Sequence, residues 1–277
     1  MTGRYLAYGR DGVFMIDADG TSIELMTSPA AVALAVGDSL LLVQEPDEGD
    51  VYPPHRGWTF EVHRPSSEPA LAAVSNRQLR LFDAGVVEGR PVALATLINW
   101  AGQDTYEDLL LVDLEASASD DSGDVFTTIA RVGGWESLVT NARLSGDLVV
   151  LSTATTLAAW SLTGGELVWA RDLFGEPRPF VVTDSEVMLI TSRFEEPGFR
   201  PFLDLTTYSL ADGDILSETS LELDAEFDGG FCLRPDWDGL RLVCDETYGG
   251  PFAVDLSSGQ IERLSDLAHG MPSVIEP

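Results

Sequence analysis

The hydrophobic positions of this sequence fall in short runs, and polar or turn-forming residues close each run. Typical examples are residues 39–43, 109–112 and 187–190, which are rich in Val and Leu. Gly, Asp, Pro or Ser follows most runs, and the spacing of an amphipathic helix is nearly absent. Short runs of this kind between turn residues are typical of buried strands. The pattern therefore predicts an all-β chain.

Pairs of predicted strands joined by a glycine-containing turn recur along the chain. They lie at residues 13–20, 159–169, 208–216 and 253–261. Such turns need a positive φ, which glycine adopts without steric cost. A repeat of about 40–50 residues that carries four strands is typical of a β-propeller blade.

Dividing the chain by this repeat predicts one domain, residues 1–277, folded as a six-bladed β-propeller. We expect five blades at 30–75, 76–132, 133–173, 175–223 and 226–267, and a sixth built from 4–28 with 270–277. The C-terminal strand would then close the ring against the N-terminal blade, which removes exposed sheet edges. An open sandwich or a pair of β domains fits less well, because no linker rich in Pro, Gly or Ser divides the chain.

Three segments resemble known propeller repeats. Residues 3–21, with their aspartate–any–aspartate–glycine ending, and residues 234–243, with a Pro-Asp turn, resemble the WD40-like repeat of TolB-type propellers. Residues 159–173 resemble blades of quinoprotein-type propellers. The TolB-like resemblance implies six blades. It says less about function, because propellers serve as binding modules and as several types of enzyme.

Composition narrows the range of partners. The 277 residues hold 46 Asp and Glu against 16 basic residues, all Arg, for a formal charge of −30, and 44% are hydrophobic. The apolar content argues against a disordered chain. The charge argues against nucleic acid and anionic membrane surfaces, and no apolar run is long enough for membrane insertion. A saline habitat or an Arg-rich codon usage explains the same charge without any partner.

The N-terminal sequence and the two cysteines indicate the cellular compartment in which the protein is expected. No charged leader precedes an apolar stretch, so we expect a cytoplasmic protein, with an exported mature form as the alternative. Cys232 and Cys244 lie on consecutive predicted strands. They are either bridged across the intervening turn or present as two buried thiols, and we favour the thiols.

Motifs of catalysis and metal binding are missing from the sequence. It holds three histidines and neither a Gly-x-Ser-x-Gly elbow, a phosphate loop nor a His-Glu-x-x-His motif. We therefore expect no catalytic residue, no metal and no cofactor, and we favour a protein that is not an enzyme.

The longest predicted loops join the second and third strands of their blades and would emerge on one face. They span 45–58, 99–108, 193–202 and 245–251, and they mix acids with aromatic residues. Aromatic residues and Arg anchor many interfaces. The expected partner-binding residues are Tyr52, Trp58, Trp100, Tyr106, Glu195, Phe199, Arg200 and Tyr248.

These features favour a non-catalytic protein-binding or scaffold propeller. Its acidic, aromatic-rich loop face would take a basic or amphipathic segment of a partner protein. Three alternatives stay open: the rings pin the loops to the blades, the chain is a propeller hydrolase or lyase with a divalent cation at the channel mouth, or it binds a glycan or small molecule.

Overall fold

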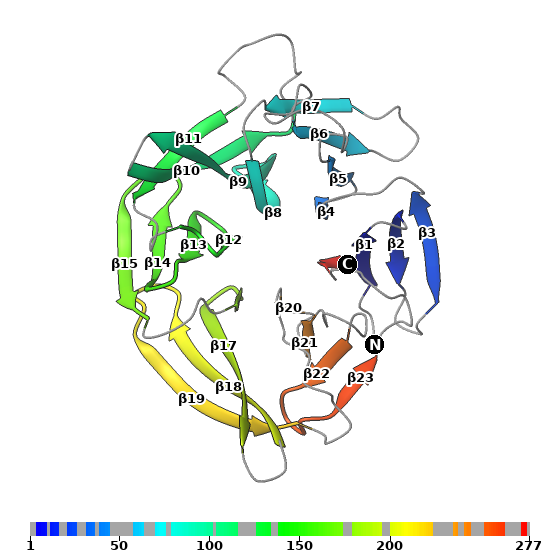
Figure 1. Ribbon diagram of the computed structural model, residues 1–277, viewed down its shortest axis with the longest axis vertical. Helices are drawn as coiled ribbons and strands as arrows, with labels where there is room; N and C mark the ends of the chain where they lie inside the picture. Colours follow the sequence, from blue (N-terminus) through cyan, green and yellow to red (C-terminus); the bar gives the residue numbers. More distant parts are fainter. Residues whose placement is uncertain are drawn as a thin grey trace. The chain divides into compact units, whose positions relative to one another are not determined.

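The computed structural model consists of strands joined by turns (Figure 1). It describes residues 4–9, 12–16, 21–26, 32–36, 39–44, 58–63, 70–75, 79–101, 104–115, 126–133, 138–173, 179–195, 200–223, 235–237, 241–244, 252–263 and 273–275. By its internal contacts the chain divides into two compact units. We call residues 30–177 the central unit, and residues 1–29 with 178–277 the terminal unit.

The described residues of the central unit form three four-stranded antiparallel sheets. The first holds β4 (Val32–Val36), β5 (Ser39–Gln44), β6 (Trp58–His63) and β7 (Ala70–Ser75). The second holds β8 (Leu79–Val87), β9 (Arg90–Ala101), β10 (Asp104–Asp113) and β11 (Phe126–Gly133). The third holds β12 (Asn141–Ser145), β13 (Leu148–Ser152), β14 (Thr156–Ser161) and β15 (Leu167–Asp172). The first strand of the middle sheet, β8, contacts the first strand of each neighbouring sheet.

The described part of the terminal unit also holds three four-stranded antiparallel sheets. One combines β1 (Arg4–Gly9), β2 (Gly12–Ile16) and β3 (Ser22–Met26) with β24 (Ser273–Ile275), and Tyr5 lies opposite Val274. Another holds β16 (Phe180–Val182), β17 (Glu186–Glu195), β18 (Arg200–Ser209) and β19 (Ile215–Glu222). The last holds β20 (Asp236–Trp237), β21 (Arg241–Cys244), β22 (Phe252–Asp255) and β23 (Ile261–Arg263).

Strands that follow one another in the chain lie side by side in these sheets, apart from β24. A four-stranded antiparallel sheet of this order is the blade of a β-propeller. The prediction of an all-β fold built from propeller-type blades is therefore confirmed at that level.

A shared turn joins the third and fourth strands of several sheets. Gly165, Gly213 and Gly259 each have a positive φ, between 63° and 73°, and each donates its N–H to the last residue of the preceding strand. The predicted glycine turn is thus confirmed at these three places, and its fourth copy, residues 17–20, lies outside the described residues. An added Cβ would lie 3.1 Å from the Ile129 carbonyl oxygen at Gly165 and 2.4 Å from that of Glu222 at Gly259. The turn at Gly259 therefore approaches the outer strand of the preceding sheet too closely for any larger residue, and at Gly165 a larger residue would require the neighbouring carbonyl to shift.

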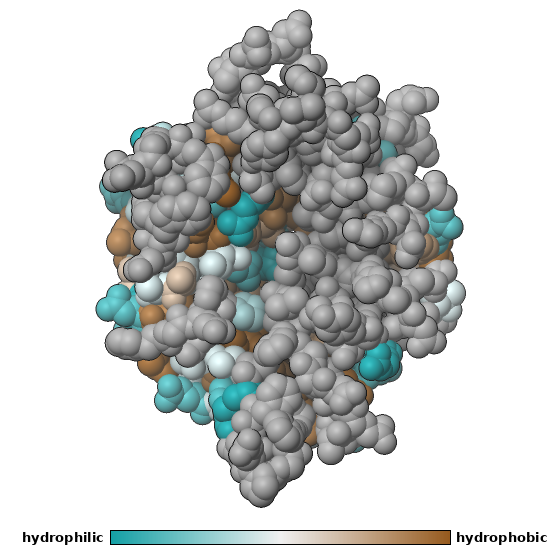
Figure 2. Space-filling view, in the orientation of Figure 1, coloured by the Kyte–Doolittle hydropathy of each residue, from teal (hydrophilic) through white to brown (hydrophobic). Residues whose placement is uncertain are grey.

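A β-bulge interrupts the pairing of the third and fourth strands in five of the six described sheets. On each fourth strand the register skips one residue, and that residue is always aliphatic; the five are Leu25, Ala72, Ile129, Val168 and Leu216. Bulges bend and twist a strand, which makes an outer edge a poor template for further pairing. Hydrophobic residues reach the outer margin of the molecule along β15 (Figure 2).

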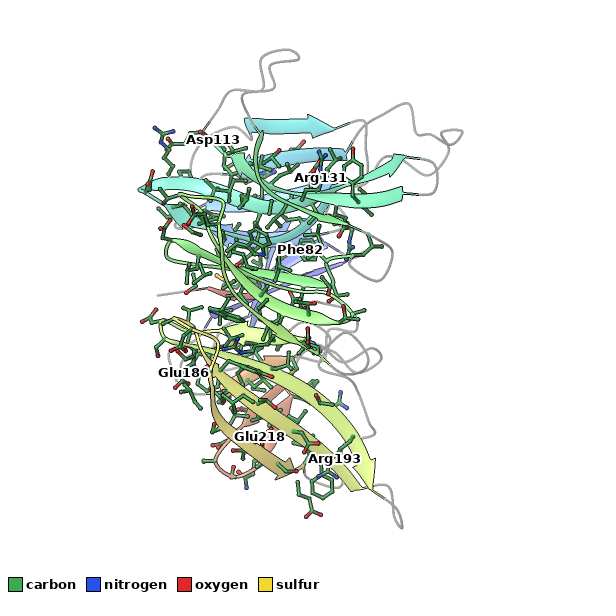
Figure 3. All side chains as sticks on the ribbon, turned by 90° about the vertical axis from the view of Figure 1, so that its left-hand side faces the viewer. Phe82, Asp113, Arg131, Glu186, Arg193 and Glu218 are labelled. Carbon is green, nitrogen blue, oxygen red and sulfur yellow. The ribbon has the colours of Figure 1, made fainter. Side chains whose placement is uncertain are left out.

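Two of the predicted loops are strands instead. β9 continues to Ala101 and β10 begins at Asp104, while β17 continues to Glu195 and β18 begins at Arg200. The prediction of long loops at 99–108 and 193–202 is therefore wrong, because cross-strand pairing carries polar residues into extended hairpins. Figure 3 shows Arg193 towards the turn end of hairpin β17–β18, where Glu195 lies opposite Arg200, and Glu186 at the opposite end of the sheet.

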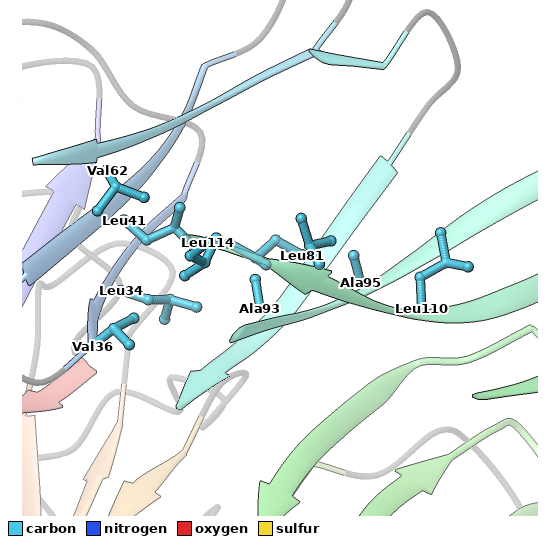
Figure 4. Close-up of a cluster of buried hydrophobic side chains, with 10 residues drawn as sticks. Leu34, Val36, Leu41, Val62, Leu81, Ala93, Ala95, Leu110 and Leu114 are labelled. Atoms are coloured by element: carbon cyan, nitrogen blue, oxygen red, sulfur yellow. The ribbon is translucent and has the colours of Figure 1, made fainter. Parts of the chain in front are cut away.

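The hydrophobic core lies between neighbouring sheets of a unit. In the central unit, Ala93 and Ala95 of β9 face a cluster shared with Leu34 and Leu41 of the first sheet (Figure 4). The alternate residue, Leu94, faces a second cluster shared with the third sheet. Side chains of a strand point alternately to its two faces, so one strand serves both clusters. In the terminal unit a similar cluster joins sheet β16–β19 to sheet β20–β23.

Cys244 is fully buried in that last cluster and forms a disulfide. The sequence holds one other cysteine, Cys232, which is therefore its partner. The expectation of two free thiols is wrong. Cys232 itself lies outside the described residues, so the bridge is assigned from Cys244 and the cysteine content of the sequence.

Candidate functional site

An arginine lies over an aromatic ring near the turn end of hairpin β9–β10, where Ala101 lies opposite Asp104. The guanidinium carbon of Arg131 lies 4.3 Å from the centroid of the Tyr106 ring. Arg131 Nε donates a hydrogen bond of 2.7 Å to Asp108 Oδ1, and Nη2 donates one of 3.3 Å to Oδ2. The side chain of Arg131 is nevertheless 62% exposed. The guanidinium is thus held in place and still open to solvent.

Hairpin β17–β18 of the terminal unit carries a second cluster of the same composition. The guanidinium carbon of Arg193 lies 4.4 Å from the centroid of the Phe202 ring. Its Nε donates a hydrogen bond of 2.5 Å to Asp204 Oδ2, and its Nη2 donates one of 2.9 Å to Ser220 Oγ. Cation–π contact and a fork of donors are both characteristic of Arg rather than Lys.

The aromatic residue and the aspartate occupy the same positions in the two sheets, whereas the arginine comes from the fourth strand at Arg131 and from the second strand at Arg193. In each, the aromatic residue is the third residue of the third strand and the aspartate is the fifth. The residue between them is buried and is Glu107 in β10 and Leu203 in β18.

Asp108 raises the pKa of Arg131 above its ordinary value. The hydrogen bond from Arg131 to Asp108 is the largest cause, desolvation opposes it, and the charges of Asp108 and Tyr106 contribute less. Arg131 therefore stays a cation wherever the chain is folded.

A buried carboxylate lies directly beneath the first cluster. Glu107 accepts hydrogen bonds from Arg80 Nη1 (3.2 Å), Thr96 Oγ1 (3.3 Å) and the backbone N–H of Val139 (2.5 Å). The last of these groups precedes β12, so the contact joins two neighbouring sheets of the central unit. Three donors on one buried carboxylate make this a structural site that holds the hairpin in place.

The structure places the eight predicted binding residues in different ways. Tyr106 is half-buried beneath Arg131. The backbones of Trp58 and Trp100 lie at the start of β6 and near the end of β9, and Trp100 lies opposite Thr105. Glu195 lies opposite Arg200 across hairpin β17–β18. Tyr52, Phe199 and Tyr248 lie outside the described residues.

Sequence reasoning missed Arg131, Arg193 and Asp204 as parts of a site. Arg131 lies 23 residues from Asp108, so their contact depends on the pairing of β10 with β11. One signal was available: an aromatic residue two positions before an aspartate at the start of a third strand, as at Tyr106 and Phe202.

Within the described ranges, no group of three or more His, Cys, Asp or Glu side chains is arranged to hold a metal ion. None of the described residues forms a helix with the length and apolar character needed to cross a membrane.

Comparison with known proteins gives similarity in structure only. No protein-family model matches this chain, and no curated protein is significantly similar to it in sequence. The WD40 domain of Neurospora crassa Pan2 is 8% identical, with a TM-score of 0.47 over 94% of this chain and 78% of that one. BamB from Moraxella catarrhalis is 14% identical, with a TM-score of 0.41 over 93% and 68%. The computationally designed protein Ika8 is 11% identical, with a TM-score of 0.49 over 100% and 97%.

Proposed function

We propose that this chain is a non-catalytic protein-binding module, which uses the turn ends of its long hairpins to hold a basic or amphipathic segment of a partner. The observation that carries the proposal is an Arg that lies over an aromatic ring and is bonded to an Asp, at Arg131 and again at Arg193. Arg and Tyr dominate the binding energy of many interfaces.

The geometry of the first cluster suits recognition because it exists before binding. Tyr106 and Asp108 already restrict the Arg131 side chain, so little side-chain entropy is left to lose on association. The outer face of the guanidinium remains open to a partner ring or carbonyl group. The net charge of −30 would steer a basic segment towards the surface.

The proposal includes the complete ring. The six four-stranded sheets would form a six-bladed propeller, closed by β24 on β1. The ring is supported by the contacts between first strands of successive sheets within each unit.

The disulfide of Cys244 favours a compartment other than the expected one. Disulfides persist in oxidising surroundings and are rare in the cytosol. We therefore propose that the chain works in an oxidising compartment rather than in the cytoplasm.

Capture of partners from an extract of the source tests the function. Arg131→Ala and Arg193→Ala should each reduce the partner captured by about tenfold relative to the unchanged chain. Arg90→Ala is the matched control, because Arg90 is exposed in the β8–β9 turn at the other end of its sheet. Capture unaltered by both cluster variants, at equal amounts of folded protein, contradicts the proposal.

A further inference from the structure

The large aliphatic side chains that the described surface exposes are concentrated at one kind of position. Six of the seven lie on the fourth strand of a sheet, at or beside the bulge; they are Ile23, Leu25, Leu167, Val168, Ile215 and Leu216. Single exposed apolar residues are common on any protein. Their repetition as pairs at one structural position is not explained by chance exposure.

The outer strand and its bulge together expose both members of a pair, since every residue of β19 from Ile215 to Ser220 is exposed. On β19 the register passes from Ser217 to Ile215, so Leu216 is the additional residue opposite Thr207 and Tyr208. Two residues of the bulged strand then oppose one on the partner strand, which breaks the in-and-out alternation. Ile215 is 58% exposed and Leu216 is 54% exposed.

The pair on β19 differs from the others in its surroundings. The turn that precedes it is bonded to the β16–β17 turn, because Leu210 N–H donates to the Ser185 carbonyl over 2.8 Å. This contact brings the two turns together, and these strands and turns carry the carboxylates of Asp184, Glu186, Asp212, Asp214 and Glu218. Neither 180–192 nor 203–222 contains a basic residue. The surface is therefore aliphatic at its centre and negative around it.

From this arrangement we infer that Ile215 and Leu216, with Asp214 and Glu218, form a docking surface for a partner segment that combines Lys or Arg with aliphatic residues. The aliphatic side chains of the segment cover the exposed pair, and its cations face the carboxylates. A second copy of this chain does not fit, because it would bring the same carboxylates against each other.

This surface is separate from the proposed hairpin-end site. Ile215 lies opposite Tyr208, one residue from the end of β18, and Glu186 lies opposite Ser209 at that same end. Arg193 lies at the other end of hairpin β17–β18 (Figure 3). The docking surface on β19 can therefore be tested independently of the hairpin-end site.

A titration of the full chain with labelled peptides tests the inference. The probe is a short fluorescent peptide of alternating Lys and Leu, compared with a Lys–Ser and a Glu–Leu peptide of equal length. We expect the Lys–Leu peptide to bind about tenfold more tightly than either. Ile215→Ser/Leu216→Ser and Asp214→Asn/Glu218→Gln should each weaken it by about tenfold. Peptide binding should also slow hydrogen exchange in β19.

The matched control is Leu167→Ser/Val168→Ser, which removes an equally exposed pair from β15, where Leu167 is 50% and Val168 45% exposed. It should leave peptide affinity within about twofold of the unchanged chain. Equal binding by the β19 variants, equal weakening by the β15 control, or equal affinity for the Lys–Ser peptide overturns the inference. Sedimentation of the chain alone adds one more outcome: a dimer that Ile215→Ser/Leu216→Ser dissociates would identify a second copy as the occupant and overturn it too.

Discussion

Glu107 and Val139 are joined by a hydrogen bond of 2.5 Å from the Val139 backbone N–H to Glu107 Oε2, although 32 residues separate them in the sequence. Glu107 is fully buried, and the equivalent position of β18 holds Leu203. One sheet thus places a charge where another places an aliphatic side chain. The charge is stable there because Arg80 and Thr96 bind its other oxygen.

Replacing Glu107 alone should destabilise the chain. Glu107→Leu leaves the Val139 N–H and the Arg80 guanidinium without their acceptor, and we expect the free energy of unfolding to fall by about 3 kcal/mol. Urea unfolding followed by tryptophan fluorescence measures the change.

The double variant Arg80→Leu/Glu107→Leu should recover part of this loss, since removing both charges is less damaging than removing one. Arg131→Ala is the control, because an exposed ion pair contributes little to the free energy of unfolding. An unchanged urea midpoint for Glu107→Leu would show that the network does not hold the sheets together.

Gly259→Ala should destabilise the chain more than Gly146→Ala. Both glycines have a positive φ, 73° and 55°, so each substitution strains the backbone by about 1 kcal/mol. At Gly259 the new Cβ would also meet the Glu222 carbonyl oxygen, whereas at Gly146 no described atom lies within 4 Å. We expect the loss at Gly259 to be larger by about 2 kcal/mol. Thermal melting of both variants provides the comparison, and equal shifts would contradict it.

Asp255 should titrate below the ordinary range of an aspartate. The hydroxyl of Ser257 is the largest cause of its lowered pKa, and the backbone N–H groups of Ser257 and Ser258 add to it. Because the folded pKa lies below the unfolded one, these bonds stabilise the chain above the unfolded pKa. Their contribution is lost as the pH falls through the folded pKa.

Ser257→Ala should therefore raise the pKa of Asp255 towards the ordinary value of an aspartate. Carboxyl carbon NMR shifts recorded against pH measure this directly. Ser217→Ala, on the exposed strand β19, is the control and should leave the Asp255 titration in place. A curve for Asp255 that is the same in all three chains would mean that the turn does not bind its carboxylate in solution.

Thiol counting tests the bridge of Cys244. Unfolded, unreduced protein isolated from its native source should give no reaction with a thiol reagent, because both cysteines of the chain are oxidised. Cys232→Ser/Cys244→Ser should lower the free energy of unfolding by about 3 kcal/mol, as expected for a short closed loop. Two reactive thiols in the native protein would contradict the bridge, and with it the proposal of an oxidising compartment.

The strands and turns were accessible from the sequence because their signals are local. Hydrophobic runs as short as a strand predict the strands, and the glycines at 165, 213 and 259 predict the turns between them. The polar ends of hairpins β9–β10 and β17–β18 were mistaken for loops, because pairing between strands rather than local preference extends them.

The candidate sites were less accessible, since their parts are distant in the sequence. Arg131 meets Tyr106 only once β10 and β11 are in register. The exposed pair Ile215 and Leu216 looks like an ordinary buried run, and only the register with β18 shows that one of them is additional. The bridge of Cys244 likewise depends on the distance between the two cysteines, which their spacing in the sequence does not give.

The bulges on the fourth strands have a consequence for how this chain behaves when concentrated. Growth of a fibril through these strands would require each one to lose its additional residue from the ladder before a neighbour could pair in register. A chain that carries aliphatic side chains on its outer strands can in this way remain dispersed. Deleting Leu216 would restore an uninterrupted ladder and make β19 a starting point for amyloid-like stacking.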